Sequence, residues 1–372
     1  MTDFKETMRK SLALTRAGNP ASATRLIQES LLRSSPDAKP ASSRPAIGSA
    51  TDHARRRNTR SADADVEDAE ILDETPSVRA TRSPPASRAP GSQGRSTSAA
   101  DAAAAPTRLE RRRHDCAYGM RDYLLFVPSG DITGIIVMLH GCTQTAEDFS
   151  RGTGMNEAAG PAGFIVIWPE QGRAYNGSLC WNWFRGSDQA ASGGEPALLA
   201  DLVRTIAREH GVAEGRSFAA GLSAGGAMAA ILGQTHPELF AAIGVHSGLA
   251  PCSAHDAVSA FGAMRGDPAP SARPLGRPCI VFQGLADHTV APVNAHRLTG
   301  PLIEVETRDH TGPGRTYRTT RGQSGVGQAV ELWEIEGAGH AWAGGKAGSS
   351  YTDPSGPNAS IEMVRFFSTQ VT

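Results

Sequence analysis

A serine flanked by small residues stands at a predicted strand-to-helix turn. Ser223 is the centre of Gly221-Leu-Ser-Ala-Gly225, which the apolar run Phe218–Ala220 precedes and a helix-favouring run follows. Small neighbours allow the sharp turn that exposes a nucleophilic hydroxyl. The segment therefore predicts Ser223 as a nucleophile, and a glycine-rich turn without chemistry is the alternative.

An acid and a base follow this serine in the chain, each after a predicted strand. Asp287 follows Cys279–Phe282, and His340 follows Val330–Ile335. A serine hydroxyl needs a base to take its proton, and an acid holds that base in the reactive tautomer. The order serine, acid, histidine is that of α/β hydrolases. We therefore predict Ser223, Asp287 and His340 as a catalytic triad.

Other histidines compete for the role of the base. His288 adjoins Asp287, but a neighbour in sequence usually points away. Asp309 and His310 lie in a polar stretch that predicts a surface loop. His246 follows a predicted strand, and we expect it either to line the site or to pack at the strand end.

Two backbone N–H groups are candidates for holding the oxyanion of an acyl-transfer reaction. Ala224 supplies one because it directly follows the nucleophile. The run Ile135–Leu139 leads into His140-Gly-Cys-Thr-Gln144, and we predict the Cys142 N–H as the second donor. On this interpretation Cys142 acts through its main chain and its thiol is not the nucleophile. A simple turn after the strand is the alternative.

Aromatic residues on predicted loops are candidates for a substrate-binding wall. Trp181 and Trp183 lie in a glycine-rich region, and Trp342 lies two residues after His340. Loop aromatics are costly unless they are covered or used in binding. We predict Trp181, Trp183, Trp342 and His246 as substrate-binding residues, with core packing as the alternative.

Composition excludes several classes of function. The 372 residues carry 37 basic and 38 acidic side chains, a net charge of -1, which argues against nucleic acid as a partner. No apolar run reaches the ~20 residues that a membrane span needs. The histidines and the five cysteines show no metal-ligand spacing, and no phosphate-binding glycine loop is present. We therefore expect no metal and no cofactor.

Short apolar runs alternate with helical segments between residues 114 and 372. Runs such as Ile135–Leu139 and Phe164–Trp168 are apolar throughout, and amphipathic segments such as Pro196–His210 separate them. Strands of this kind, separated by helices, indicate a mostly parallel sheet covered on both faces. We predict one α/β domain over 114–372, with an α/β-hydrolase fold.

The chain before this domain falls into two zones. Residues 1–35 predict a helical segment, either a docking element for a partner or a marginal helix pair that packs weakly on the main domain. Residues 36–113 contain no Phe, Trp or Tyr and predict a disordered linker. Charged residues interrupt the start of the chain, where a signal peptide needs an apolar stretch of about 7–15 residues. We therefore expect a cytoplasmic location.

Several motifs together resemble the catalytic domain of poly(3-hydroxybutyrate) depolymerases and related esterases. They are Leu139-His-Gly-Cys-Thr-Gln144, Pro169-Glu-Gln171, Cys180-Trp-Asn-Trp-Phe184, Gly221-Leu-Ser-Ala-Gly-Gly-Ala-Met228, Gln283-Gly-Leu-Ala-Asp-His-Thr-Val290 and Gly339-His-Ala-Trp342. The resemblance covers Tyr118 to Phe367. It implies an α/β-hydrolase fold, a serine-esterase mechanism through the predicted triad and oxyanion donors, and short-chain polyhydroxyalkanoate as the substrate class.

The resemblance leaves the substrate open. Feruloyl, acetylxylan and general carboxylesterases are similar, and a non-catalytic granule-associated protein is a third interpretation. Many family members carry a signal peptide and a substrate-binding module, for which this sequence gives no indication. Granules, soluble oligomers or small esters are therefore the expected substrates, with the N-terminal helices as a tether to a granule. A disulfide between Cys142 and Cys180, which both flank the predicted site, is a further hypothesis.

Overall fold

The computed structural model describes residue 10 and residues 109–371. The remainder of the helical segment predicted for 1–35, and 36–108 of the predicted linker, lie outside the described residues. The first strand, β1, spans Leu109–Cys116, so the linker prediction is wrong for residues 109–113. β1 pairs along its whole length with 119–126, and its exposed Arg111 and Arg113 also contact Glu170 and Asp122, so its mostly charged sequence gives no apolar pattern to indicate a strand.

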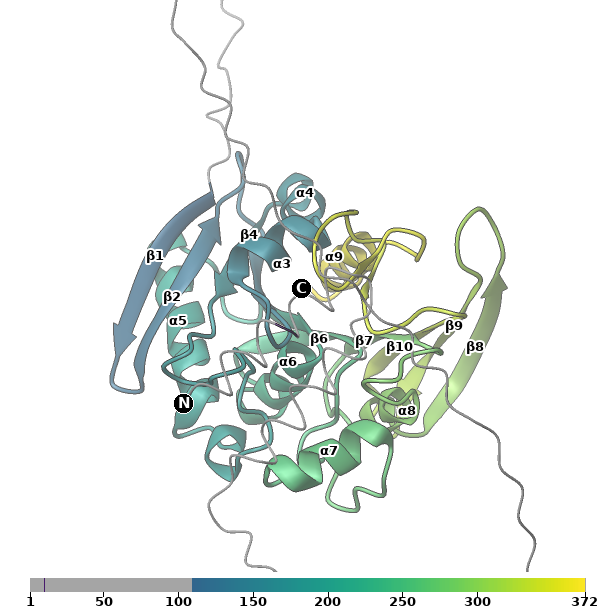
Figure 1. Ribbon diagram of the computed structural model, residues 1–372. Helices are drawn as coiled ribbons and strands as arrows, with labels where there is room; N and C mark the ends of the chain where they lie inside the picture. Colours follow the sequence, from purple (N-terminus) through teal and green to yellow (C-terminus); the bar gives the residue numbers. More distant parts are fainter. Residues whose placement is uncertain (1–9, 11–108, 372) are drawn as a thin grey trace, which may run out of the picture. The chain divides into compact units, whose positions relative to one another are not determined.

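A ten-stranded sheet forms the centre of the domain, in the order β1-β2-β4-β3-β5-β6-β7-β10-β9-β8 (Figure 1). The six central strands, β4-β3-β5-β6-β7-β10, run parallel to one another. At each edge of the sheet two further strands are added by antiparallel pairing, β2 and then β1 next to β4, and β9 and then β8 next to β10. After β1 the strands are β2 Gly119–Phe126, β3 Gly134–Leu139, β4 Phe164–Pro169, β5 Ser217–Leu222, β6 Phe240–His246, β7 Cys279–Gly284, β8 Leu302–His310, β9 Tyr317–Ser324 and β10 Ala329–Ile335.

Helices cover both faces of this sheet. They are α3 Ala146–Thr153, α4 Met155–Ala159, α5 Gly194–His210, α6 Ala224–Thr235, α7 Ala257–Arg265, α8 Val293–Thr299 and α9 Ala359–Ser368. Short 3-10 turns occupy η1 Gly160–Ala162 and η2 Gly186–Gln189, and a small second sheet pairs β11 Trp342–Ala343 with β12 Thr352–Asp353. Helices α3, α4 and α9 cover one face of the sheet, and α5 and α6 cover the opposite face (Figure 1).

The alternation of side chains along each strand builds two separate cores. Val137 and Leu139 of β3 join the core under α5 and α6, whereas Ile136 and Met138 join the core under α3, α4 and α9. Successive side chains of a strand point to opposite faces, so a strand between two helical layers must be apolar at every position. This is the reason that the continuous apolar runs in the sequence predicted the central strands.

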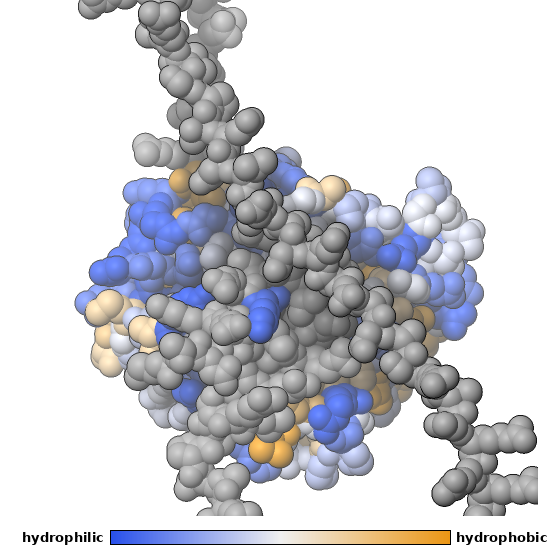
Figure 2. Space-filling view, viewed as in Figure 1, coloured by the Kyte–Doolittle hydropathy of each residue, from blue (hydrophilic) through white to orange (hydrophobic). Residues whose placement is uncertain are grey.

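The predicted α/β class, with a mostly parallel sheet, is confirmed. Asp309 and His310, which were predicted to lie in a surface loop, instead belong to β8, an edge strand that is almost wholly exposed. Figure 2 shows mainly hydrophilic surface over the β1–β2 hairpin and over β8 and β9. In the part of the chain that the structure describes, every helix is too short or too polar to cross a bilayer.

Candidate active site

Ser223 stands at the turn between β5 and α6, with a backbone conformation that residues other than glycine rarely adopt. Its φ and ψ are 58° and -120°, and its N–H donates to the His246 carbonyl at 2.9 Å. A Cβ on Gly221 would collide with the backbone of Gly225, and one on Gly225 would collide with the Leu139 carbonyl. Only glycine fits at both motif positions, so the sequence forces a tight elbow that holds the serine at the end of the sheet.

Asp287 and His340 meet beyond the ends of β7 and β10, which are adjacent parallel strands. His340 Nδ1 and Asp287 Oδ2 are 2.7 Å apart. Asp287 Oδ1 also accepts the N–H groups of Thr289 and Val290 at 2.9 and 2.8 Å. Burial by itself raises the pKa of Asp287, but the facing imidazole and these hydrogen bonds outweigh it and lower the pKa. Asp287 is therefore an ionised acceptor that fixes the ring of His340.

His246 connects the serine to the loop that carries His340. Its carbonyl accepts the Ser223 N–H, while its Nε2 accepts the N–H of Ala343 at 3.0 Å. The ring proton is therefore on Nδ1, which lies 3.2 Å from Ser247 Oγ. Burial lowers the pKa of His246 to about 3, so the ring is neutral at pH 7. No hydrogen bond joins Ser223 Oγ to His340 within residues 109–371, and such bonds often tighten only in the substrate complex.

The predicted oxyanion loop packs against the serine elbow. A Cβ on Gly141 would lie 3.6 Å from the Ser223 Cβ, which places the next residue, Cys142, beside the nucleophile. Gln144 Oε1 accepts the Gly141 N–H at 2.8 Å and holds the loop from within. Ala224 is the first residue of α6, where an N–H has no acceptor inside the helix. Both predicted donors thus lie on the segments that flank Ser223.

His140 orients the peptide that carries the Cys142 N–H. Its Nε2 accepts the Gln171 N–H at 3.0 Å, so its proton is on Nδ1, which donates to the Gly141 carbonyl at 2.8 Å. Burial lowers the pKa of His140 to about 4 and keeps the ring neutral. The Gly141 carbonyl and the Cys142 N–H belong to one planar peptide and point in opposite directions. The bond to the carbonyl therefore sets the direction of the N–H.

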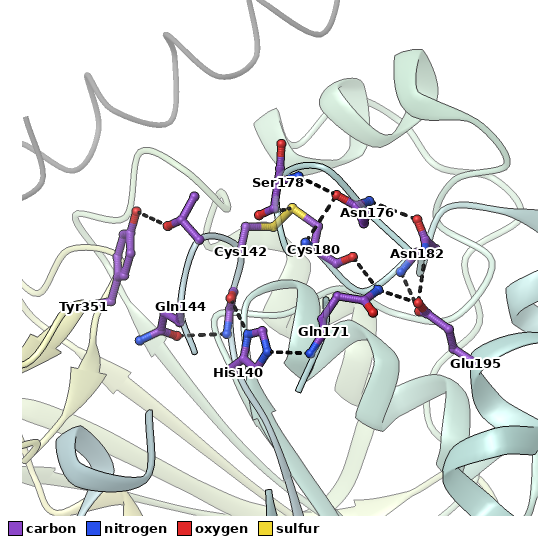
Figure 3. Close-up of a disulfide and its surroundings, with 12 residues drawn as sticks. His140, Cys142, Gln144, Gln171, Asn176, Ser178, Cys180, Asn182, Glu195 and Tyr351 are labelled. Carbon is purple, nitrogen blue, oxygen red and sulfur yellow. Dashed lines mark hydrogen bonds between the residues drawn. A yellow bond between two sulfur atoms is a disulfide. The ribbon is translucent and has the colours of Figure 1, made fainter. Parts of the chain in front are cut away.

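A disulfide and a buried carboxylate hold this loop from the other side (Figure 3). Cys142 and Cys180 are joined, as hypothesised, across 38 residues of sequence. Gln171 donates through its side chain to both the Cys180 carbonyl and Glu195, and Glu195 also accepts the Asn182 N–H at 2.7 Å. Burial raises the pKa of Glu195 despite these donors. The network fixes the 171–182 segment against the oxyanion loop.

The four predicted substrate-binding side chains are all buried. Trp181 and Trp342 are 0% exposed, and Trp183 and His246 are almost as deeply buried. Trp342 Nε1 donates to Ser360 Oγ at 3.1 Å, and its ring packs on His246. These positions favour the core-packing alternative, in which the side chains support the site from behind.

Sequence reasoning missed one aromatic that does stand beside the candidate base. Tyr351 lies edge-on to the His340 ring, with centroids 6.3 Å apart, and its hydroxyl is 3.4 Å from Thr143 Oγ1. It therefore bridges the base and the oxyanion loop from the segment between β11 and β12. No motif surrounds Tyr351, so only its place in the fold reveals it. His288, the competing base, is exposed, whereas His340 is buried against Asp287.

Comparison with known proteins places this geometry in a family. Residues 121–324 match the family model described as esterase PHB depolymerase. The chain is 29% identical over 239 residues to poly(3-hydroxyalkanoate) depolymerase C of Paucimonas lemoignei, covering 58% of this chain and 56% of the relative. It is 36% identical over 141 residues to acetylxylan esterase A of Talaromyces purpureogenus, covering 36% of this chain and 35% of the relative.

A solved structure agrees in fold. The acetyl xylan esterase from Aspergillus awamori superposes with a TM-score of 0.52 at 21% identity, over 63% of this chain and 94% of that one. The chain spans about half the length of the first curated relative and about a third of the second. With more than half of its residues matched by the family model, the chain belongs to the esterase family of the poly(3-hydroxybutyrate) depolymerases.

Proposed function

We propose that this protein is a serine esterase that hydrolyses ester bonds of short-chain polyhydroxyalkanoates, such as poly(3-hydroxybutyrate) or its oligomers. The observation that carries the proposal is the convergence of three features at one edge of the sheet. These are the strained Ser223 elbow, the Asp287–His340 hydrogen bond of 2.7 Å, and the oxyanion loop packed on the elbow. Family membership supports the same chemistry.

Each group has a defined task in the proposed reaction. Ser223 Oγ attacks the ester carbonyl carbon while its proton passes to His340 Nε2, and the Cys142 and Ala224 N–H groups bind the oxyanion. The intermediate collapses, and His340 returns the proton to the departing alcohol. Water then attacks the acyl-enzyme, gives its proton to His340, and releases the hydroxyacid and the free serine. Asp287 stays ionised and stabilises the imidazolium at both steps.

A groove on the same edge of the sheet supports a chain-like substrate. It encloses about 610 Å³ and is lined by η2, the loop after β6, and α7. The loop after β6 leaves the sheet between the strands that carry Ser223 and Asp287, because β6 lies between β5 and β7. Most of its exposed lining is apolar, with the exposed Val258 at one side, and its polar groups include the buried Ser253 hydroxyl and the charged side chains of Arg265 and Asp267. Such a surface suits an aliphatic polyester, which is apolar with regularly spaced carbonyl acceptors.

Deacetylation of a carbohydrate is the second candidate function. It is favoured by the acetylxylan esterases among the relatives and by the fold shared with the Aspergillus awamori enzyme. The same serine mechanism serves both reactions, so the difference lies in what binds beside the acyl group. The predominantly apolar groove favours the polyester over a polyhydroxylated sugar chain.

The two candidates are separated by hydrolysis of p-nitrophenyl butyrate, amorphous poly(3-hydroxybutyrate) and acetylated xylan by the full chain. We expect release of p-nitrophenol and of hydroxybutyrate, and loss of both by several orders of magnitude in Ser223→Ala. Acetate release from xylan with an inert polyester would replace the proposal by the second candidate. Inertness of the wild type toward all three substrates would favour the non-catalytic interpretation.

The groove has its own test. Val258→Arg introduces a charge at a 70% exposed position of the lining, and Ile361→Arg does the same at a 54% exposed position of α9. We expect Val258→Arg to lower the rate on polyester severalfold with the p-nitrophenyl butyrate rate within about twofold of wild type. Ile361→Arg should change neither rate. Equal polyester rates for the two variants would remove the groove from the proposal.

A further inference from the structure

Three metal-ligand side chains meet at the β1 edge of the sheet, between β1 and α5. His114 and Cys116 are alternate residues of β1 and so share one face of the strand. Asp201 projects from α5 toward the same point. One ligand atom of each residue lies within 4.8 Å of the other two, and His114 Nε2 is 2.8 Å from Asp201 Oδ2.

The donor set suits Zn²⁺. Imidazole nitrogen, thiolate sulfur and carboxylate oxygen are the three ligand types that zinc takes in proteins, commonly at three positions with water at the fourth. Tetrahedral bonds of about 2.0–2.3 Å separate ligand atoms by roughly 3.3–3.8 Å, so small side-chain rotations complete the geometry. A thiolate and a carboxylate together balance the double charge of the ion.

The scaffold around these residues is already fixed. Residues 109–116 pair in register with 126–119 of β2. Two residues before His114, Arg112 forms an ion pair of 2.7 Å with Glu209, two turns beyond Asp201 on α5. The strand and the helix are thus held face to face without a metal. Cys116 and Asp201 are half-buried, which leaves a path for the ion and a water molecule.

We propose that His114, Cys116 and Asp201 form a zinc site that fastens the edge strand β1 to α5. β1 lies four strands from β5, a separation of about 19 Å at ordinary strand spacing, so the ion stabilises the fold and takes no part in ester hydrolysis. On binding, Cys116 releases its proton. The His114 proton moves to Nδ1 so that Nε2 holds the metal. Sequence spacing did not indicate this site because 87 residues separate His114 from Asp201.

The experiment uses the full chain without an affinity tag, stripped of metal by a chelator that is then removed. Zn²⁺ alone is titrated in competition with a chromophoric chelator, and thermal unfolding is followed with and without the ion. Cys116→Ser and Asp201→Asn test the site. Cys252→Ser, at another half-buried free cysteine, and Asp115→Asn, on the opposite face of β1, are the matched controls.

We expect one Zn²⁺ per chain and a higher unfolding temperature in zinc for the wild type and both controls. Cys116→Ser and Asp201→Asn should weaken binding by at least roughly 100-fold, more than the loss of an outer hydrogen-bond partner. The p-nitrophenyl butyrate rate should not depend on zinc. Equal zinc affinity in wild type and Cys116→Ser would overturn the proposal, since it would leave only the His114–Asp201 hydrogen bond.

Cobalt gives an answer that needs no variant. Co²⁺ bound to a thiolate produces a strong near-ultraviolet charge-transfer absorption, and Zn²⁺ should displace it from the wild type. Absence of this absorption at saturating Co²⁺ would show that Cys116 is not a ligand, even if a variant failed to fold. Because this readout is independent of ester hydrolysis, it distinguishes failure of the zinc site from failure of the proposed function.

Discussion

Replacing Asp287 with Asn tests how the candidate triad is held together. The Asp287 carboxylate accepts hydrogen bonds on both oxygens. Oδ1 accepts the N–H groups of Thr289 and Val290 at 2.9 and 2.8 Å, and Oδ2 faces His340 Nδ1 at 2.7 Å. Gln283 Nε2 also donates to Oδ2 at 3.3 Å. In Asp287→Asn the amide can take two orientations, with its oxygen at either the Oδ1 or the Oδ2 position and its NH₂ at the other.

The two backbone donors decide the orientation. An NH₂ at the Oδ1 position would leave the part-buried Thr289 N–H and the buried Val290 N–H without acceptors, at a cost of about 1–3 kcal/mol for the buried group and less for the other. The Asn oxygen therefore stays with Thr289 and Val290, and the NH₂ faces His340. The ring then accepts on Nδ1 and carries its proton on Nε2, so Nε2 has no lone pair for the Ser223 proton. The corresponding exchange in serine proteases lowers kcat about 10⁴-fold, and we expect a fall of about 10³- to 10⁴-fold, or roughly 4–5.5 kcal/mol.

The assay is steady-state hydrolysis of p-nitrophenyl butyrate at pH 7, with circular dichroism and urea unfolding to establish that the variant is folded. Asp309→Asn, on the exposed strand β8, is the matched control and should stay within about twofold of wild type. KM should change little, because Asp287 does not contact substrate in the proposed mechanism. A folded Asp287→Asn with kcat within tenfold of wild type would refute the tautomer argument.

Three further predictions concern stability. The pKa values of buried His140 and His246 are lowered from 6.5 to about 4 and about 3, so the unfolded chain binds more protons below pH 6.5 and stability falls with acidification. The free energy of unfolding in urea should be lower at pH 5 than at pH 7 by about 2 kcal/mol for each ring, and His140→Gln should remove the contribution of His140 to that difference. A pH difference in His140→Gln equal to that of wild type would contradict the prediction. Cys180→Ser opens the link to Cys142 across 38 residues and should lower the free energy of unfolding by up to about 4 kcal/mol, with reduced wild type as the comparison. Glu195→Ala leaves the buried guanidinium of Arg121 without its ion-pair partner and should lower the free energy of unfolding in urea by about 3–5 kcal/mol. Glu195→Gln keeps the shape of the side chain and should lower it less.

The disulfide also bears on where the protein works. Disulfides persist mainly in oxidising compartments and are rare in the cytosol. The Cys142–Cys180 bond is therefore at odds with the cytoplasmic location expected from the start of the chain. Counting free thiols in protein isolated under alkylating conditions would show whether this disulfide forms in the cell. Three free thiols are expected if it does and five if it does not.

Sequence patterns were enough to predict the α/β class and most of the central strands, and to propose Ser223, Asp287 and His340 as candidate nucleophile, acid and base. The physical reason is local. A strand buried between two helical layers must be apolar throughout, and an elbow needs small residues around Ser223. The order of Ser223, Asp287 and His340 relative to these runs follows from the same patterns. Edge strands with exposed, charged side chains, such as β1 and β8, carry no such signature. Part of β1 therefore fell within the predicted linker, and Asp309 and His310 of β8 were predicted to lie in a surface loop.

Which side chains support the candidate site, and through which contacts, became visible only in the folded domain. His140 and His246 act through hydrogen bonds to Gln171 and Ala343, which are distant in sequence, and no spacing rule connects these pairs. The burial of a side chain likewise depends on segments that are distant in sequence and pack against it. The sequence could therefore place Trp342 near His340 but could not assign its side chain to the core or to a substrate cleft. Contacts between residues far apart in the chain are set by how the sheet and its helical layers pack, and that information is spread over the whole domain.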